Sequence, residues 1–197
     1  MMVVIVKRKL VARDVRERMV EGAVRLLARH GLQATSFNEV LELTGAPRGS
    51  IYHHFPGGKD ELIRAAVDHA GMRSLKVLDD RDNASAEEIT AVFLGLWREL
   101  LTRAQFRAGC AVLAVTVATD SPDLLNETGT VFRAWRGRLA QLLEEGGLSA
   151  KEAAQFAATL VAASEGAVAL SRAEQSMEPF DLVTEQLLDQ VRGMTSR

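Results

Sequence analysis

Apolar residues recur at spacings of three and four along most of the chain, which is the period of one face of an α-helix. The first such stripe opens at Asp14, which with Glu17 resembles a capping box, and it stops at Gly31. We therefore expect a helix over residues 14–30. Its inward positions are Val15, Met19, Ala23, Leu26, Leu27 and His30.

Two short helices are predicted next. Ser36 and Glu39 have the spacing of a second capping box, and Gly45 ends the helix that they open. Pro47 suits the first turn of the following helix, residues 47–55, because its missing N–H would have no partner there in any case. A long helix followed by two short ones with a glycine between them is the pattern of a helix-turn-helix. The apolar face of the first short helix is Phe37, Val40, Leu41 and Leu43.

The pattern predicts an all-α fold with two domains, residues 10–58 and residues 59–197. In the second domain the run CAVLAVTVAT, residues 110–119, is apolar on all sides and would also suit a strand by propensity. We expect a buried helix there, because no partner strand is visible elsewhere. The other helices are expected over residues 59–78, 85–105, 121–145, 149–173 and from Pro179 onward, the last with Phe180, Val183, Leu187, Val191 and Met194 on its apolar face.

Cysteine content and apolar runs favour the cytoplasm. Cys110 is the only cysteine among 197 residues, which excludes an internal disulfide and suits a reducing compartment. The start, MMVVIVKRKL, places an apolar run before the basic cluster, which is the reverse of a signal peptide. No run approaches the roughly 18 apolar residues of a membrane span, so no membrane contact is expected.

Charge is unevenly distributed, although the net charge is only −2. Residues 1–60 hold ten Lys/Arg and six Asp/Glu, whereas the remaining residues hold 14 basic and 20 acidic side chains. A basic end on an acidic body is expected when one end meets a polyanion. A cluster such as Lys7-Arg8-Lys9 is equally compatible with a solvated tail.

The second short helix carries an unusual density of polar groups. Ile51 and Phe55 are four residues apart and share a face that we expect to pack on the core, which leaves Arg48, Tyr52 and His53 pointing elsewhere. Side chains on neighbouring helical positions diverge by about 100°. His53 and its neighbour His54 therefore cannot readily share a metal ion, and His54 also suits a partly buried packing position.

Neither catalysis nor a cofactor is expected. No third metal ligand accompanies the histidines at helical spacing. No Ser/His/Asp set, glycine-rich phosphate loop or paired carboxylate shares their segment. The chain is therefore not expected to be an enzyme.

A DNA-reading surface fits these residue types better. An arginine can bind guanine O6 and N7 through two hydrogen bonds, so Arg48 is expected to read a base, while Gly49 permits a close approach. Hydroxyl and imidazole groups can donate to phosphates, and the helix N-terminus at Ser36 favours an anion. The expected DNA contacts are Thr35, Ser36, Pro47, Arg48, Gly49, Ser50, Tyr52, His53, His54 and the flanking positive charge of Lys59.

The stretch TSFNEVLELTGAPRGSIYHHF, residues 35–55, with KDEL at 59–62, resembles the N-terminal domain of TetR-family transcriptional repressors. The variant APRGSIYHHFPGGK is similar to the LmrA/YxaF-like subgroup, as are, less specifically, Gly109-Cys110 and Glu165-Gly166-Ala167. The resemblance implies a homodimer whose C-terminal helical domain dimerises and binds a small molecule. It further implies a repressor that a small apolar or aromatic effector releases from a palindromic, double-stranded DNA operator.

Aromatic and small polar residues of the second domain are candidates for the effector pocket, although core packing is the alternative for each. Glu165 interrupts an alanine-rich helix, so it could hold a ligand, pair with an arginine or be solvated. The candidates are Phe93, Trp97, Phe106, Cys110, Thr116, Phe132, Trp135 and Glu165.

The helix at 150–173 and the apolar stripe of the last helix are expected to form a four-helix dimer interface, two helices from each subunit. The alternative is that both helices close the core of their own subunit. The rival to a repressor is a helical ligand-binding or protein-interaction module without DNA binding, against which Arg48, Tyr52 and Lys59 argue.

Overall fold

The computed structural model describes the backbone of residues 2–79, 81 and 83–196, and within these ranges the side chains from Val15 onward. This part of the chain contains nine helices and no strand, which confirms the predicted all-α class. The helices are α1 (Met2–His30), α2 (Phe37–Thr44), α3 (Arg48–His54), α4 (Lys59–Lys76), α5 (Ala86–Ala104), α6 (Ala111–Thr116), α7 (Pro122–Glu145), α8 (Ala150–Glu174) and α9 (Glu178–Thr195).

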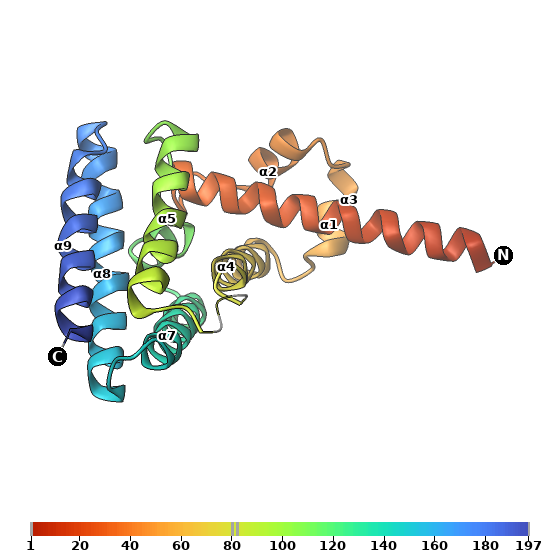
Figure 1. Ribbon diagram of the computed structural model, residues 1–197. Coiled ribbons are helices and arrows are strands. Elements are labelled where there is room, and N and C mark those ends of the chain that lie inside the picture. The colour runs from red at the N-terminus through yellow and green to blue at the C-terminus, as the bar shows by residue number, and fades with distance from the viewer. Residues whose placement is uncertain (1, 80, 82, 197) are drawn as a thin grey trace.

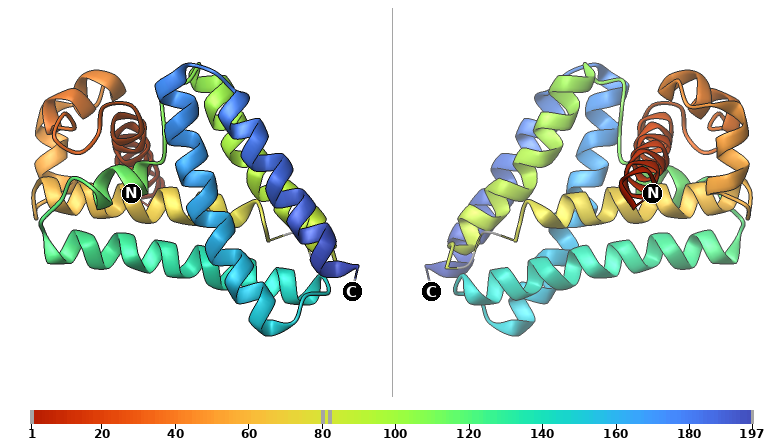
Figure 2. Two further views of the ribbon diagram at one scale, coloured as in Figure 1. Left: turned by 90° about the vertical axis from the view of Figure 1, so that its left-hand side faces the viewer. Right: turned by 90° about the vertical axis from the view of Figure 1, so that its right-hand side faces the viewer.

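The first three helices lie at one end of the molecule and α8 and α9 lie at the other (Figure 1). We call α1–α3 the head and α4–α9 the body. α4 leads from the head into the body, where it lies alongside α7 (Figure 2). α5, α8 and α9 pack on one another and cross the α4–α7 pair, and α8 also packs on α7. α4 therefore touches both the head and the body, and α6 of the body also packs on α1.

Capping boxes begin three helices where the sequence predicts them. The hydroxyls of Ser36, Ser85 and Ser149 each accept a hydrogen bond from the backbone N–H three residues later, at α2, α5 and α8. Gly45 ends α2 in the left-handed conformation, with φ of 64°, where a side chain would be strained. The boundaries predicted from these local signals are confirmed.

Two helices differ from the prediction by more than two residues at one end. α1 begins at Met2, so Asp14 lies inside the helix and does not cap it. Residues 2–13 contain no glycine or proline that would end a helix before Asp14. The run at 110–119 is helical as predicted, but α6 covers only Ala111–Thr116, with Cys110 as its N-cap.

α8 is apolar enough, by length and composition, to cross a membrane. One 18-residue window has a mean hydropathy of 1.4, so the expectation that no run approaches a span was wrong. Half of that window is buried inside the protein, against α7, α9 and α5. A buried core helix passes the same compositional test as a membrane span, and the packing of α8 is that of a core helix.

The apolar stripe of α9 faces the interior of its own subunit. Phe180, Leu187 and Val191 are buried in the single chain, where α9 packs on α8 and α5. The expectation that this stripe forms a dimer interface was therefore wrong. The physical reason is that the stripe completes the core of the body, so it is already covered by apolar side chains of the same chain.

Candidate nucleic-acid interface and ligand cleft

Close packing between α1 and α2 positions the head. A β-carbon on Gly22 of α1 would lie 2.5 Å from Cγ2 of Thr44, so the glycine permits the two helices to approach. Arg18 Nη1 on α1 donates to the backbone oxygen of Thr44 over 3.3 Å. The guanidinium of Arg16 lies 5.2 Å from the centre of the Phe55 ring, beyond the end of α3. These contacts hold α2 and α3 against the long first helix.

α3 separates an apolar inner face from a polar outer face. Ile51 and Phe55 are fully buried, as the helical spacing predicts. Arg48, at the first position of the helix, and His53 are exposed, and Tyr52 has 70% of its surface exposed. Pro47 and Gly49 are exposed as well. The outer face of α3 thus presents a guanidinium, a phenol and an imidazole to solvent.

Aromatic contact joins the two short helices. The ring of Phe37 on α2 meets that of Tyr52 edge-on, with centroids 5.7 Å apart. α3 begins at Arg48, one residue later than predicted, with Pro47 as its N-cap. The carbonyl of Pro47 accepts a hydrogen bond of 2.6 Å from the hydroxyl of Ser50. The conformation of the turn and the orientation of α3 are therefore fixed by short-range contacts.

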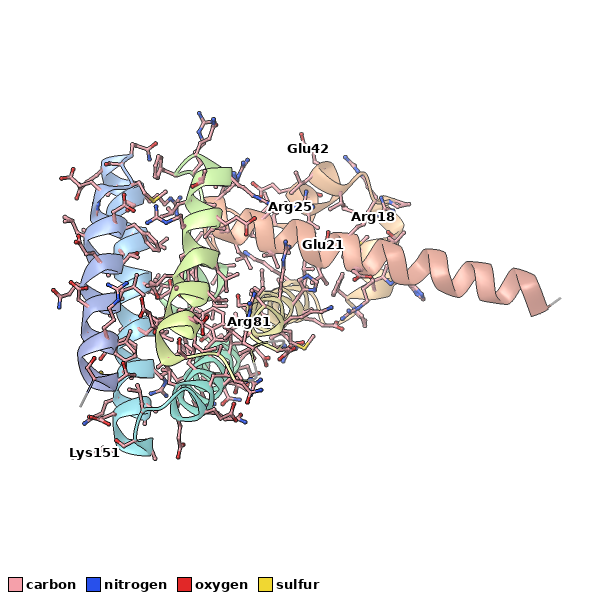
Figure 3. All side chains as sticks on the ribbon, in the orientation of Figure 1. Arg18, Glu21, Arg25, Glu42, Arg81 and Lys151 are labelled. Carbon is pink, nitrogen blue, oxygen red and sulfur yellow. The ribbon has the colours of Figure 1, made fainter. Side chains whose placement is uncertain are left out.

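The acidic residues of the head lie on α1 and α2 and not on α3. Figure 3 shows Arg18, Glu21 and Arg25 on α1 and Glu42 on α2. Arg25 pairs with Glu21 over 3.6 Å at the surface. α3 itself carries no acidic residue, because its sequence is RGSIYHH. The outer face of α3 is consequently free of carboxylates of its own.

Two of the residues expected to contact DNA are engaged inside the protein. Thr35 is buried, and its hydroxyl donates to the backbone oxygen of Gly31 over 2.8 Å, so it stabilises the turn between α1 and α2. Lys59 is half-buried, and its Nζ donates to the backbone oxygen of Leu32 over 3.0 Å. Ser36 accepts from the backbone N–H of Glu39 over 3.3 Å, which leaves its own hydroxyl proton available to a phosphate.

The adjacent histidines differ in environment. Their ring centroids are 5.3 Å apart and the rings meet edge-on. His53 is exposed, whereas His54 is half-buried, and burial is the main cause that lowers the pKa of His54, followed by the charges of His53 and Arg16. Within the described side chains, no three His, Cys, Asp or Glu residues gather as metal ligands. His54 thus matches the packing alternative, and His53 remains on the outer face.

A cleft of about 550 Å³ lies in the body between α6, α7 and α8. Of the eight residues predicted for the effector pocket, Phe132 and Glu165 line it. The remaining lining comes mostly from small or aliphatic residues, which carry no chemical signal in the sequence. They are Leu113, Arg136, Ala158, Val161, Ala162, Gly166 and Ala169.

The other predicted pocket residues belong to the core or to its edges. Phe93, Trp97 and Trp135 are buried and form a chain of edge-on ring contacts that ends at Phe132. Phe106 is partly buried against the core. The hydroxyl of Thr116 donates to the backbone oxygen of Val112 over 2.9 Å, and Cys110 is buried at the start of α6. These six residues do not line the cleft.

Glu165 is the unusual group of the cleft. It is 7% exposed, and among the described residues no hydrogen-bond donor of ordinary geometry reaches either carboxylate oxygen. Burial raises the pKa of this carboxyl to about 7, and the nearby thiol of Cys110 opposes the shift weakly. Burial also raises the pKa of Cys110, with the carboxylate as a second cause, so the thiol stays protonated.

Both the head and the body match known protein families. Residues 19–66 match the family described as bacterial regulatory proteins, tetR family. Residues 86–186 match the family described as transcriptional regulator LmrA/YxaF-like, C-terminal domain.

Individual relatives agree with these matches. An uncharacterized HTH-type transcriptional regulator of Mycobacterium tuberculosis is 35% identical over 179 residues, which are 87% of this chain and 91% of the relative. The HTH-type regulator YxaF of Bacillus subtilis is 31% identical, over 88% of this chain and 93% of its own length. The regulator LmrA of the same species is 27% identical, over 85% and 91% respectively.

Solved structures reproduce the fold. The regulatory protein TetR from Rhodobacter sphaeroides superposes with a TM-score of 0.77 at 24% identity, covering 88% of this chain and 96% of that protein. A TetR transcriptional regulator from Chloroflexus aurantiacus gives a TM-score of 0.76 at 25% identity, covering 92% and 96%.

Proposed function

The chain belongs to the TetR family of bacterial transcriptional regulators, and on that premise we propose that it is a cytoplasmic, ligand-responsive repressor. Regulators of this family are transcription factors and not enzymes. The protein binds a palindromic operator as a homodimer, and a small apolar or aromatic effector releases it. Residues 10–58 read the DNA, and residues 59–197 dimerise and bind the effector.

The outer face of α3 carries the proposal of DNA reading. N-terminal residues of a recognition helix contact base edges in the major groove, and Arg48 occupies the first position of α3. Gly49 beside it allows the groove wall to approach, while Tyr52 and His53 donate to phosphates. The hydroxyl of Ser50 donates to the Pro47 carbonyl, so Ser50 stabilises the start of α3. Pro47 contacts the sugar-phosphate backbone of the DNA, and His54 supports α3 from its partly buried position.

Phosphate contacts flank α3 on both sides. The N-terminus of α2 offers the Ser36 hydroxyl and free backbone N–H groups to a phosphate. Thr35 contributes by holding the turn before α2, because its hydroxyl and its backbone N–H both donate to carbonyls of that turn. Lys59 adds positive charge at the start of α4, while its ammonium also binds the Leu32 carbonyl.

Dimerisation uses the outward faces of α8 and α9. Leu170 on α8 and Leu182 on α9 are large apolar residues exposed in the single chain, with 52% and 61% of their surfaces accessible. Burying them against a second copy removes apolar surface from water. A two-fold dimer presents its α3 helices to half-sites about 34 Å apart, which requires a palindromic operator.

α7 and α4 carry the effector signal. Trp135 on α7 donates from Nε1 to the backbone oxygen of Gly71 on α4 over 3.0 Å, and its ring touches Phe132 of the cleft. Gly71 packs so closely that a β-carbon would lie 2.7 Å from Cγ1 of Val131. A ligand that displaces Phe132 therefore moves α4, which starts at the head.

The far end of α1 acts as the pivot. The backbone N–H of Gly109 donates to the carbonyl of Ala28 over 2.8 Å, and Nη2 of Arg172 donates to that of Arg29 over 2.8 Å. These bonds fix the C-terminus of α1 to the body. Movement of α4 then rotates the head about this point and changes the separation of the two α3 helices.

Binding to the DNA upstream of the protein's own gene tests the function. Fluorescence anisotropy compares this fragment with a random duplex at two salt concentrations, for the unmodified protein, Arg48→Ala and Arg103→Ala. Arg103 is an exposed body arginine, so its loss should leave both affinities unchanged. Arg48→Ala should reduce the preference for the specific fragment. Absence of any DNA binding by the unmodified protein would favour a helical ligand-binding or interaction module instead.

A further inference from the structure

Glu165 is a charged group placed where an apolar side chain would be expected. It lies in the middle of α8 with only 7% of its surface accessible, and among the described residues its only close donor is the weak thiol of Cys110, which lies outside ordinary hydrogen-bond geometry. Burying an ionisable group without a partner destabilises the folded state. Glu165 lines the cleft between α6, α7 and α8, but neighbouring atoms cover its two oxygens, so a bound molecule reaches them when the lining side chains shift.

The surroundings of the carboxyl select the chemistry of such a molecule. Arg136 is the only other ionisable residue of the cleft lining, and it is exposed. Cys110 is the titratable neighbour outside the lining, and a thiol is a weak donor. Leu113, Val161 and the ring of Phe132 make the wall apolar. The cleft is open to solvent, has a volume of about 550 Å³ and an apolar wall, and the Glu165 carboxyl is its one acceptor without a strong donor.

We propose that Glu165 binds a protonated nitrogen of an otherwise apolar ligand, so that the effector of this protein is an aromatic or aliphatic monoamine. The regulatory meaning of this site rests on the function proposed above. The site itself is defined by the carboxyl, the ring of Phe132 and the small residues of α8.

An amine suits the site better than a neutral or anionic group. A hydrogen bond between two charged groups is about twice as strong as one between neutral groups. The face of the Phe132 ring attracts a cation as well. A carboxylate ligand would instead face the like charge of Glu165. A second positive charge on the ligand would meet the guanidinium of Arg136 at the exposed side, so one charge is favoured over two.

Ligand binding should then depend on pH. Burial raises the pKa of the Glu165 carboxyl to about 7, and burial together with this carboxylate raises the pKa of Cys110, so the thiol stays protonated. The ionised fraction of the carboxyl rises about tenfold between pH 6 and pH 8, while an alkylamine remains protonated. The affinity for an amine should therefore rise about tenfold over this range, and that for a neutral analogue should not.

Three probes of one shape test the assignment: naphthylmethylamine, naphthylmethanol and naphthoate. Titration calorimetry on the full chain at pH 6 and pH 8 compares the unmodified protein with Glu165→Gln, which keeps the size of the side chain. The matched control is Glu174→Gln, because Glu174 is the exposed glutamate at the end of the same helix. The pH dependence of the unmodified protein provides a readout that needs no variant.

The amine should bind at least about tenfold more tightly than the alcohol at pH 8, and naphthoate should bind most weakly. Glu165→Gln should remove both the preference for the amine and its pH dependence, and Glu174→Gln should change neither. The assignment is overturned if the amine does not bind, if the alcohol or naphthoate matches it, or if Glu165→Gln keeps the preference.

Operator DNA in a parallel titration separates this inference from the proposed function. If the amine binds through Glu165 and operator affinity is unchanged, the ligand response fails while the recognition of amines stands. If another compound releases the operator and the amine does not bind, the response stands and the assignment of Glu165 fails.

Discussion

Glu165 should make the stability of the protein fall as pH rises, and Glu165→Gln should abolish that fall. The pKa of the carboxyl is raised from 4.5 to about 7 in the folded chain, with burial as the main cause. A folded state that holds the proton more tightly than the unfolded state loses stability between these two pKa values. Below pH 4.5 the carboxyl is neutral in both the folded and the unfolded state, so burying its charge does not lower the free energy of unfolding. Above pH 7 it is ionised in both states, and the full loss of unfolding free energy is present.

The size of the effect follows from the shift. One pKa unit corresponds to about 1.4 kcal/mol, so a shift from 4.5 to about 7 amounts to about 3 kcal/mol of unfolding free energy. Because Glu165 is 7% exposed, solvent screening removes little of this value. A loss of that size is a large share of the stability of an ordinary domain, which is about 5–15 kcal/mol.

Urea denaturation at several pH values between 4.5 and 8 measures the effect, with all proteins at one concentration because a dimer's stability depends on it. The pKa of His54 is lowered, mainly by burial, and its contribution is common to all the variants, so the informative quantity is the difference between Glu165→Gln and the unmodified protein. That difference should grow by about 3 kcal/mol across the range and then level off above pH 7. Parallel curves would refute the reasoning, as would an equal effect of Glu174→Gln.

Three further predictions concern DNA, coupling and assembly. Arg48→Ala should weaken operator binding by about 1–3 kcal/mol per half-site and relax the sequence preference at one base pair. Lys59→Ala should instead weaken binding to all duplexes alike and reduce its salt dependence. If Arg48→Ala loses equal affinity for specific and random DNA, Arg48 contacts a phosphate and not a base. Trp135→Phe removes the hydrogen bond to the Gly71 carbonyl, so it should lower the free energy of unfolding by about 1 kcal/mol. It should also reduce the factor by which operator DNA weakens ligand binding, measured by ligand titration with and without operator. An unchanged factor would exclude the Trp135–Gly71 contact as the path of the effector signal. Leu182→Arg changes an exposed position, so this variant should sediment as a folded monomer. Leu187→Arg changes a buried position, so this variant should lose the circular dichroism signal of its helices. If Leu182→Arg still sediments as a dimer, the interface lies elsewhere.

Helix boundaries could be predicted wherever a local signal sets them. The capping boxes at Ser36, Ser85 and Ser149 act within four residues, so their geometry is contained in the sequence. The two faces of α3 were predictable for the same reason, because Ile51 and Phe55 lie one turn apart. The start of α1 was not, since Asp14 and Glu17 have the spacing of a capping box but the preceding residues are also helical.

Contacts that form only in the folded chain decide which of the predicted DNA-binding side chains are available to DNA. Thr35 and Lys59 have side chains that could bind a phosphate, but they donate instead to the carbonyls of Gly31 and Leu32. These carbonyls lie just beyond the end of α1, where no helical N–H follows to bind them. No spacing rule states that a carbonyl at a helix end will take a particular lysine 27 residues later. The role of a polar residue therefore depends on neighbours that only the folded chain supplies.

The ligand cleft was harder to predict than the DNA-reading face because its walls are chemically plain. Large aromatic side chains such as Phe93 and Trp97 fill the core, where they bury the most surface, and so they are poor markers of an open space. A cleft forms where side chains are too small to fill the gap between helices, as along Ala158, Ala162 and Gly166. Phe132 and Glu165 were the predicted residues that do line it, and Glu165 was the clearer signal, because an acid in an alanine-rich helix needs a physical reason.

The stripe of α9 illustrates why periodicity cannot assign an interface. Spacing at three and four residues indicates that one face of the helix is covered, but it is the same whether the cover comes from the same chain or from a second copy. In the folded chain Leu187 is 3% exposed and Leu182 is 61% exposed, so the periodic position belongs to the subunit core and the residue outside the stripe is free to meet a partner. A charge at Leu187 must therefore be accommodated by every folded subunit, whereas a charge at Leu182 is opposed only when two subunits associate.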